Sequence, residues 1–108
     1  MVREDAVKLA REYIGALSDH GLKITRAIIF GSYARGDSND NSDIDLLLVS
    51  PDFDNDNDRY YGLLWKLTKI GNYKIEPVPV GEEYFSRDSG SPIVEIAKHE
   101  GYELKIAR

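Results

Sequence analysis

The sequence contains no cysteine, which excludes a disulfide framework as well as thiolate metal or redox chemistry. No apolar run approaches the ~18 residues that a membrane-spanning helix needs. The first residues, MVREDAVKLAREY, are charged throughout and lack the apolar segment of a signal peptide. These absences predict a cytoplasmic protein with no membrane partner.

Basic residues are also few, because 14 Lys and Arg stand against 19 Asp and Glu, for a formal net charge of −5. General nucleic-acid binding depends on many Lys and Arg contacts to phosphates, so it is not expected. A single nucleotide can still bind where a divalent metal ion supplies the positive charge. With 108 residues, the chain is expected to form one domain, residues 1–108.

Apolar periodicity predicts alternating helices and strands. Helices are expected over residues 5–18, 59–70 and 92–100, a short helical turn over 32–35, and strands over 24–30, 44–49, 73–80 and 102–106. In the last helix, Ile93, Ile96 and Ala97 are expected to face inward. The order predicts an α/β (α+β) fold with a small mixed β-sheet flanked by helices.

Two local features refine this outline. Pro77 and Pro79 remove two backbone donors from one side of the third strand, which predicts that this strand lies at an edge of the sheet. The acidic stretch PDFDNDND, residues 51–58, alternates Asp as a calcium loop does. The sixth and twelfth positions counted from Asp52 are Asn57 and Leu63 instead of the required Gly and Glu, so a solvated loop is expected.

The stretch GSYARGDSNDNSDID, residues 31–45, contains two short motifs that we reject. Residues 31–38 have the spacing of a P-loop, but Asp37 stands where a P-loop needs Lys, and a carboxylate would repel phosphates. The RGD tripeptide at residues 35–37 is an adhesion signal of secreted proteins, and no other feature of this sequence is typical of secretion. Another interpretation accounts for more residues of the stretch.

Asp43 and Asp45 are two residues apart at the start of a strand, so both side chains are expected on one face of the sheet. Two carboxylates held close together repel each other unless a counter-charge is present. Hard oxygen ligands suit Mg²⁺. Two such ions ~3.5–4 Å apart can stabilise the attacking and leaving oxygens of a phosphoryl transfer, which is the chemistry that this pair predicts.

Gly31 and Ser32 fit the same interpretation. Gly31 has no side chain, so backbone can approach a phosphate closely, and Ser32 adds a hydroxyl donor whether or not it also caps the short helix. Arg35 is expected to reach the same triphosphate, to stack on the base, or to remain a solvated or carboxylate-paired side chain. Tyr33 is expected to belong to the core, with stacking on the base as the alternative.

Glu76 is the only acidic residue within the third predicted strand. A lone acid there costs free energy unless it is paired, bound to a metal or facing solvent. If it shares a face with the two aspartates, it can bind metal and accept the proton of an attacking hydroxyl. The alternative is a solvent-facing residue of an edge strand.

The stretch GSYARGDSNDNSDIDLLL resembles the signature of the nucleotidyltransferases of the DNA polymerase beta superfamily: Gly-Ser, a spacer, then Asp-x-Asp on a strand. Size and element order are similar to the minimal (MNT) form of that family. The closing SPIVEIAKHEGYELK is similar to the C-terminal helix and strand of these proteins. The resemblance covers most of the chain and implies a polymerase beta palm-like fold.

The resemblance implies that Gly31 and Ser32 hold the triphosphate of ATP, and that Asp43 and Asp45 bind two Mg²⁺ ions. Glu76 would be the third carboxylate, where the family more often has Asp. Family members of this length commonly pair with a HEPN-domain toxin and transfer AMP to one of its tyrosines. The acceptor would then be a separate molecule or a subunit of a homo- or hetero-oligomer. Two alternatives stay open: an antitoxin that only binds, and transfer to a small molecule.

Overall fold

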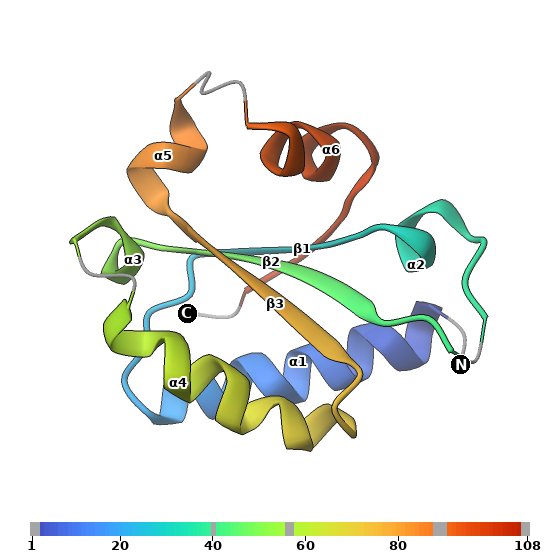
Figure 1. Ribbon diagram of the computed structural model, residues 1–108, viewed down its shortest axis with the longest axis horizontal. Coiled ribbons are helices and arrows are strands. Elements are labelled where there is room, and N and C mark those ends of the chain that lie inside the picture. The colour runs from blue at the N-terminus through green and yellow to red at the C-terminus, as the bar shows by residue number, and fades with distance from the viewer. Residues whose placement is uncertain (1–2, 40, 56–57, 88–90, 107–108) are drawn as a thin grey trace.

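The computed structural model describes residues 3–39, 41–55, 58–87 and 91–106 (Figure 1). Its helices are α1 (Arg3–Asp19), α2 (Ser32–Arg35), α3 (Asp52–Asn55), α4 (Asp58–Lys66), the 3-10 helix η1 (Leu67–Gly71), α5 (Glu82–Ser86) and α6 (Pro92–Glu100). Its strands are β1 (Arg26–Phe30), β2 (Ile44–Ser50), β3 (Ile75–Gly81) and β4 (Tyr102–Leu104). The strands form one sheet in the order β3-β2-β1-β4.

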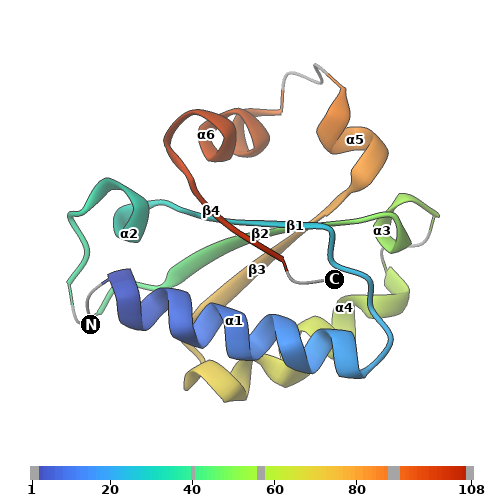
Figure 2. The same cartoon turned by 180° about the vertical axis from the view of Figure 1, so that it is seen from behind.

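The sheet is mixed, as predicted, because β1 is antiparallel to both β2 and β4 whereas β2 and β3 are parallel. Helices α1 and α4 cover one face, and α5 and α6 cover the other (Figures 1 and 2). Each face has its own group of buried side chains, and the larger group lies under α1. The α+β class expected from the sequence is therefore confirmed.

The first helix follows its sequence pattern closely. It buries one stripe of residues three and four apart, namely Ala6, Ala10, Tyr13, Ile14 and Leu17. The hydroxyl of Tyr13 donates to the carbonyl oxygen of Leu64 at 2.7 Å, which joins α1 to α4. The chain leaves the helix at Asp19 and turns at Gly21, whose φ of 87° suits a residue without a side chain.

Strand β3 lies at the edge of the sheet, as Pro77 and Pro79 predict. The amide of Ile44 donates to the carbonyl oxygen of Lys74 at 2.7 Å, so the even-numbered residues of this segment direct their backbone polar groups towards β2. The two proline nitrogens therefore face away from β2, towards the side of β3 on which the described residues form no further strand.

Two predictions about the helices are wrong in part, and one helix was missed. Residues 52–55 form a helical turn instead of a solvated loop, because Phe53 is buried; residues 56–57 of that predicted loop lie outside the described residues. The helix predicted over residues 59–70 changes to a 3-10 helix at Leu67. Helix α5 was not predicted; it buries Phe85.

The predicted inward face of α6 is also wrong in part. Val94 and Ala97 are buried against the sheet, whereas Ile93 and Ile96 are each 44% exposed. Gly101, directly after the helix, has no room for a side chain because the Ile28 side chain and a carbonyl of the helix fill that space. The close approach of α6 to β1 leaves space for one narrow stripe of the helix, so the two isoleucines turn outward.

Among the described residues, none of the helices combines the length and the apolar content that crossing a bilayer requires.

Candidate active site

The register of the sheet brings Asp45 and Glu76 side by side. They are direct partners in the parallel pair of β2 and β3, so their side chains point to the same face. That face carries α5 and α6, because Leu47 and Val78, two residues further along each strand, pack in the buried group beneath those helices. The charge of Glu76 is close enough to act on the Asp45 carboxyl and raise its pKa.

Burial, followed by the neighbouring charges of Glu76 and Asp43, raises the pKa of the Asp45 carboxyl from its ordinary 3.8 to about 6. Phe30 contributes to the apolar surroundings, since it faces Asp45 across the pair of β1 and β2. The positive charge of Arg35 acts in the opposite direction and lowers this pKa. Two carboxylates in such contact share a proton readily, and a cation between them would replace that proton.

Asp43 lies one residue before β2 and is exposed, yet its charge reaches Asp45. Asp43, Asp45 and Glu76 are thus neighbours and offer the hard oxygen ligands that Mg²⁺ prefers. Within the part of the chain that the structure describes, however, no three His, Asp or Glu side chains already form a metal-binding group. Metal binding by all three carboxylates requires side-chain movement, which the exposure of Asp43 and Glu76 allows.

Gly31 joins the two ends of the sequence signature. β1 ends at Phe30, and Gly31 then turns the chain with φ 75° and ψ −148°, a conformation that is essentially restricted to glycine. A Cβ atom on Gly31 would overlap Oδ2 of Asp45 and lie 3.2 Å from its Cγ. The residue must be glycine both for its backbone conformation and because the Asp45 carboxylate fills the adjacent space.

Ser32 begins α2 directly after this turn and is half-buried, and it follows the glycine that lies against Asp45. The carbonyl of Gly31 accepts hydrogen bonds from the amides of Ala34 and Arg35 at 3.1 and 3.0 Å. At the other end of α2, the guanidinium of Arg3 donates to the carbonyls of Tyr33 (3.1 Å) and Ala34 (2.6 Å). This short helix is therefore held from both ends.

Arg35 is exposed and lies between two carboxylates, with Nε 3.2 Å from Asp37 and Nη1 3.4 Å from Glu100 at the end of α6. Its proposed contact with a nucleotide stays a prediction, since the paired position is the alternative that the sequence left open. Tyr33 is 1% exposed and belongs to the core, so stacking of its ring on a base is excluded.

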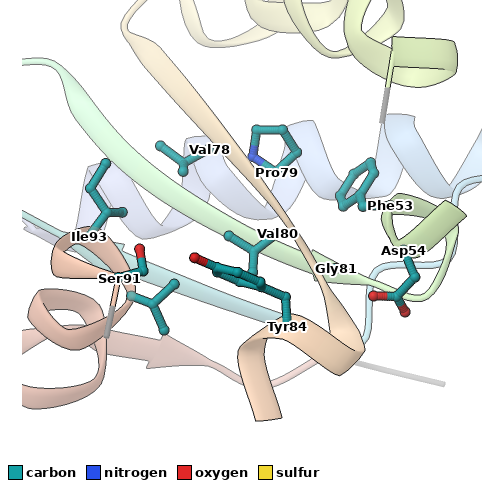
Figure 3. A pocket seen from close by; sticks show the side chains of 10 residues that line it. Phe53, Asp54, Val78, Pro79, Val80, Gly81, Tyr84, Ser91 and Ile93 are labelled. Carbon is teal, nitrogen blue, oxygen red and sulfur yellow. The ribbon is translucent and has the colours of Figure 1, made fainter. Parts of the chain in front are cut away.

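A hollow of about 400 Å³ lies further along β3 on the same face of the sheet (Figure 3). Val78 and Val80 line it from the strand, Tyr84 from α5 and Ile93 from α6. The sequence does not indicate this hollow, because its walls come from elements that only the fold brings together. The single signal was the spacing of Val78, two residues after Glu76 and so on the same face.

Comparison with known proteins is consistent with this geometry. A family model described as "Nucleotidyltransferase domain" matches residues 10–101. A Methanocaldococcus jannaschii protein named "Putative protein adenylyltransferase" is 40% identical over 82 residues, which cover 74% of this chain and 78% of that protein.

A crystal structure described as "a putative nucleotidyltransferase from Sulfolobus solfataricus" superposes with a TM-score of 0.62 at 20% identity. The superposition covers 94% of this chain and 80% of that one, which shows a shared fold. Because the family model spans most of the sequence and the signature residues meet at one site, the chain belongs to the nucleotidyltransferase family of the DNA polymerase beta superfamily.

Proposed function

We propose that this protein is a Mg²⁺-dependent adenylyltransferase that transfers AMP from ATP to a tyrosine hydroxyl of a partner protein. The observation that carries the proposal is the meeting of Asp45, Glu76 and Gly31 at one end of the sheet. The name of the M. jannaschii relative supports a protein as the acceptor. Resemblance to minimal nucleotidyltransferases supports a HEPN-domain toxin as the partner, with this chain as its antitoxin.

In the proposed reaction, Asp43, Asp45 and Glu76 would hold Mg²⁺, and the ion would supply positive charge to the phosphates and the attacking oxygen. Gly31 and Ser32 would hold the triphosphate beside Asp45. The tyrosine oxygen attacks the α-phosphorus and forms a new P–O bond, while the bond to the bridging oxygen breaks and pyrophosphate leaves. Glu76 accepts the hydroxyl proton, for which its exposed position beside Asp45 is suited.

The proposal is tested by incubating the protein with α-labelled ATP, Mg²⁺ and a HEPN-domain protein from the same genome. Label should move to the partner, and it should fall at least about 100-fold in Asp45→Asn and after addition of EDTA. Asp5→Asn is a suitable control, because that carboxylate is exposed on α1, on the other side of the sheet.

Two other outcomes would contradict the proposal. Neutralisation of the toxin that survives Asp43→Asn and Asp45→Asn would indicate an antitoxin that acts by binding alone. Transfer of label to a small hydroxyl compound, with none to the protein, would indicate a small-molecule acceptor. Both outcomes leave the family assignment intact and change only the acceptor or the role of catalysis.

A further inference from the structure

The order of strands indicates the side from which an acceptor approaches, an argument that rests on the proposed function. In an in-line transfer, the attacking oxygen and the leaving pyrophosphate lie on opposite sides of the α-phosphorus. The triphosphate would lie at Gly31 and Ser32, at the end of β1, whereas Glu76 lies on β3. Because β2, with Asp45, separates these strands, the acceptor must arrive over β3 and the free edge of the sheet.

The hollow beside β3 lies on this side and on the same face. Val78 follows Glu76 by two residues, which is about 6.6 Å along a strand, and lines the hollow. Figure 3 shows Val78, Val80, Tyr84 and Ile93 around this space, and Tyr84 and Ile93 are each 44% exposed. Apolar surface therefore begins two residues along β3 from Glu76, the carboxylate that would receive the acceptor proton.

One face of α6 extends this apolar surface towards the phosphate side. Ile93, Ile96 and Glu100 have the spacing of residues on a single helix face. Ile93 lies in the hollow, and Glu100 reaches Arg35 on α2 at 3.4 Å. Ile96, 44% exposed, lies between these two points and thus on the side of α6 that runs past the carboxylates. We define the acceptor surface as Val78, Tyr84, Ile93 and Ile96.

The free edge of β3 does not suit pairing with a strand of another protein. Pro77 and Pro79 have no backbone N–H, and their nitrogens face away from β2. A partner strand added here would find no donor at two successive outward positions. A protein acceptor would therefore bind through side chains on the α5/α6 face instead of by extending the sheet.

We propose that the acceptor surface binds apolar side chains that flank the modified tyrosine in a protein acceptor, with Lys or Arg residues beside them. Among the described residues that line the hollow, none is Lys or Arg and one is Asp54, and the chain carries a net charge of −5. Exposed apolar side chains next to an acidic group complement an apolar and basic segment. Ile96 extends the apolar surface beyond the hollow, and such an extended surface fits a protein segment better than a small molecule.

The test uses two synthetic tyrosine peptides of equal length with two lysines each. One has two leucines beside the tyrosine, and the other has serines in their place. The leucine peptide should shift the NMR signals of the acceptor surface and be a better AMP acceptor, with kcat/KM about tenfold higher, because its leucines lose apolar surface to water on binding. N-acetyltyrosinamide serves as the small acceptor.

The double variant Ile93→Ser and Ile96→Ser should reduce the preference for the leucine peptide to about twofold or less. Both side chains are already half-exposed, so the fold should persist, which circular dichroism checks. Trp65→Ser is the matched control, because Trp65 is 41% exposed on α4, on the other face of the sheet, and the preference should persist.

The outcomes separate this inference from the proposed function. Equal transfer to both peptides, or equal use of N-acetyltyrosinamide, without NMR shifts at the acceptor surface would overturn the docking proposal and leave adenylyl transfer standing. Selective shifts at Val78, Tyr84, Ile93 and Ile96 without transfer to any acceptor would support the docking surface and contradict the proposed function.

Discussion

The carboxylate of Asp45 occupies the space in which a side chain on Gly31 would begin. The Gly-Ser turn after β1 and the Asp-x-Asp segment at the start of β2 are therefore in direct contact, although a polar spacer separates them in the sequence. Any group held at the turn would lie beside Asp45 and, through the register of β2 and β3, close to Glu76. This contact makes one site out of three separate segments.

Gly31→Ala should both destabilise the protein and abolish AMP transfer. The φ of 75° strains any side-chain-bearing residue, and the new methyl group would overlap Asp45. We expect the free energy of unfolding to fall by about 1–3 kcal/mol in urea denaturation.

Two other glycines provide matched controls for this substitution. Gly36→Ala also places a side chain at positive φ, 86°, but in the left-handed helical region, which strains alanine less than the conformation of Gly31. A Cβ atom there would meet nothing within 4 Å, so most transfer activity should remain. Gly15→Ala, with open space inside α1, should stabilise the protein by about 0.5–1 kcal/mol. Equal losses of activity in Gly31→Ala and Gly36→Ala would show that the overlap with Asp45 is unimportant.

The stability of the metal-free protein should depend on pH through Asp45. Its pKa is 3.8 ordinarily and about 6 in the folded protein, so between these values the folded protein binds more protons than the unfolded chain. The contribution of protonated Asp45 is therefore complete below pH 3.8 and is lost as the pH rises through 6.

Urea denaturation in EDTA from pH 3.5 to 8 measures this effect as the difference between the wild type and Asp45→Asn. The wild type should lose stability relative to the variant as the pH rises, with the change centred between pH 4 and 6. Parallel curves for the two proteins would contradict the raised pKa of Asp45. Addition of Mg²⁺ at pH 8 should stabilise the wild type more than the variant.

Glu76→Gln should affect stability and activity in opposite directions. Removing the neighbouring charge should lower the pKa of Asp45 and stabilise the metal-free protein near neutral pH. Transfer of AMP should fall about 10²–10⁴-fold, because the acceptor proton loses its base. Glu76→Asp should retain part of the activity, and Glu12→Gln on α1 should retain all of it. Full transfer by Glu76→Gln would indicate a solvent-facing edge residue.

Arg3→Ala should loosen α2 without touching the carboxylates. Its guanidinium donates to two carbonyls of that helix, those of Tyr33 and Ala34. We expect a loss of about 1 kcal/mol in the free energy of unfolding. Hydrogen exchange should accelerate relative to the wild type, and the acceleration should be larger at the amides of Arg35 and Gly36 than elsewhere in the chain. Arg3→Lys should restore only part of the protection, since Lys lacks the forked donor geometry. Unchanged exchange at α2 would show that Arg3 contributes nothing to its order.

The tertiary structure differs from the sequence-based predictions where an apolar pattern is compatible with more than one orientation of a helix. Residues 93–97 read Ile-Val-Glu-Ile-Ala, so two adjacent stripes of α6 are apolar, and periodicity alone cannot select between them. The narrow space over β1 selects Val94 and Ala97 and leaves the isoleucines for the outer face. Phe53, too, becomes buried only because α3 packs where α5 and the end of β3 meet.

The sequence by itself determined the features that repeat or act over a few residues. The stripe of α1, its end before Gly21 and the edge position of β3 follow from helix periodicity, glycine conformation and the missing donors of proline. The signature residues likewise indicate their chemistry locally, because paired carboxylates suit Mg²⁺ and a glycine turn before a helix suits a phosphate.

Only the tertiary structure decided that Glu76 lies beside Asp45. That contact depends on the parallel pairing of two strands, which is a long-range relationship that no local pattern encodes. The tertiary structure also brings together the apolar surface of α5, α6 and β3, whose residues are distant in sequence. Local geometry is set by neighbouring residues, but contacts between segments are set by how whole faces of the sheet and helices bury each other.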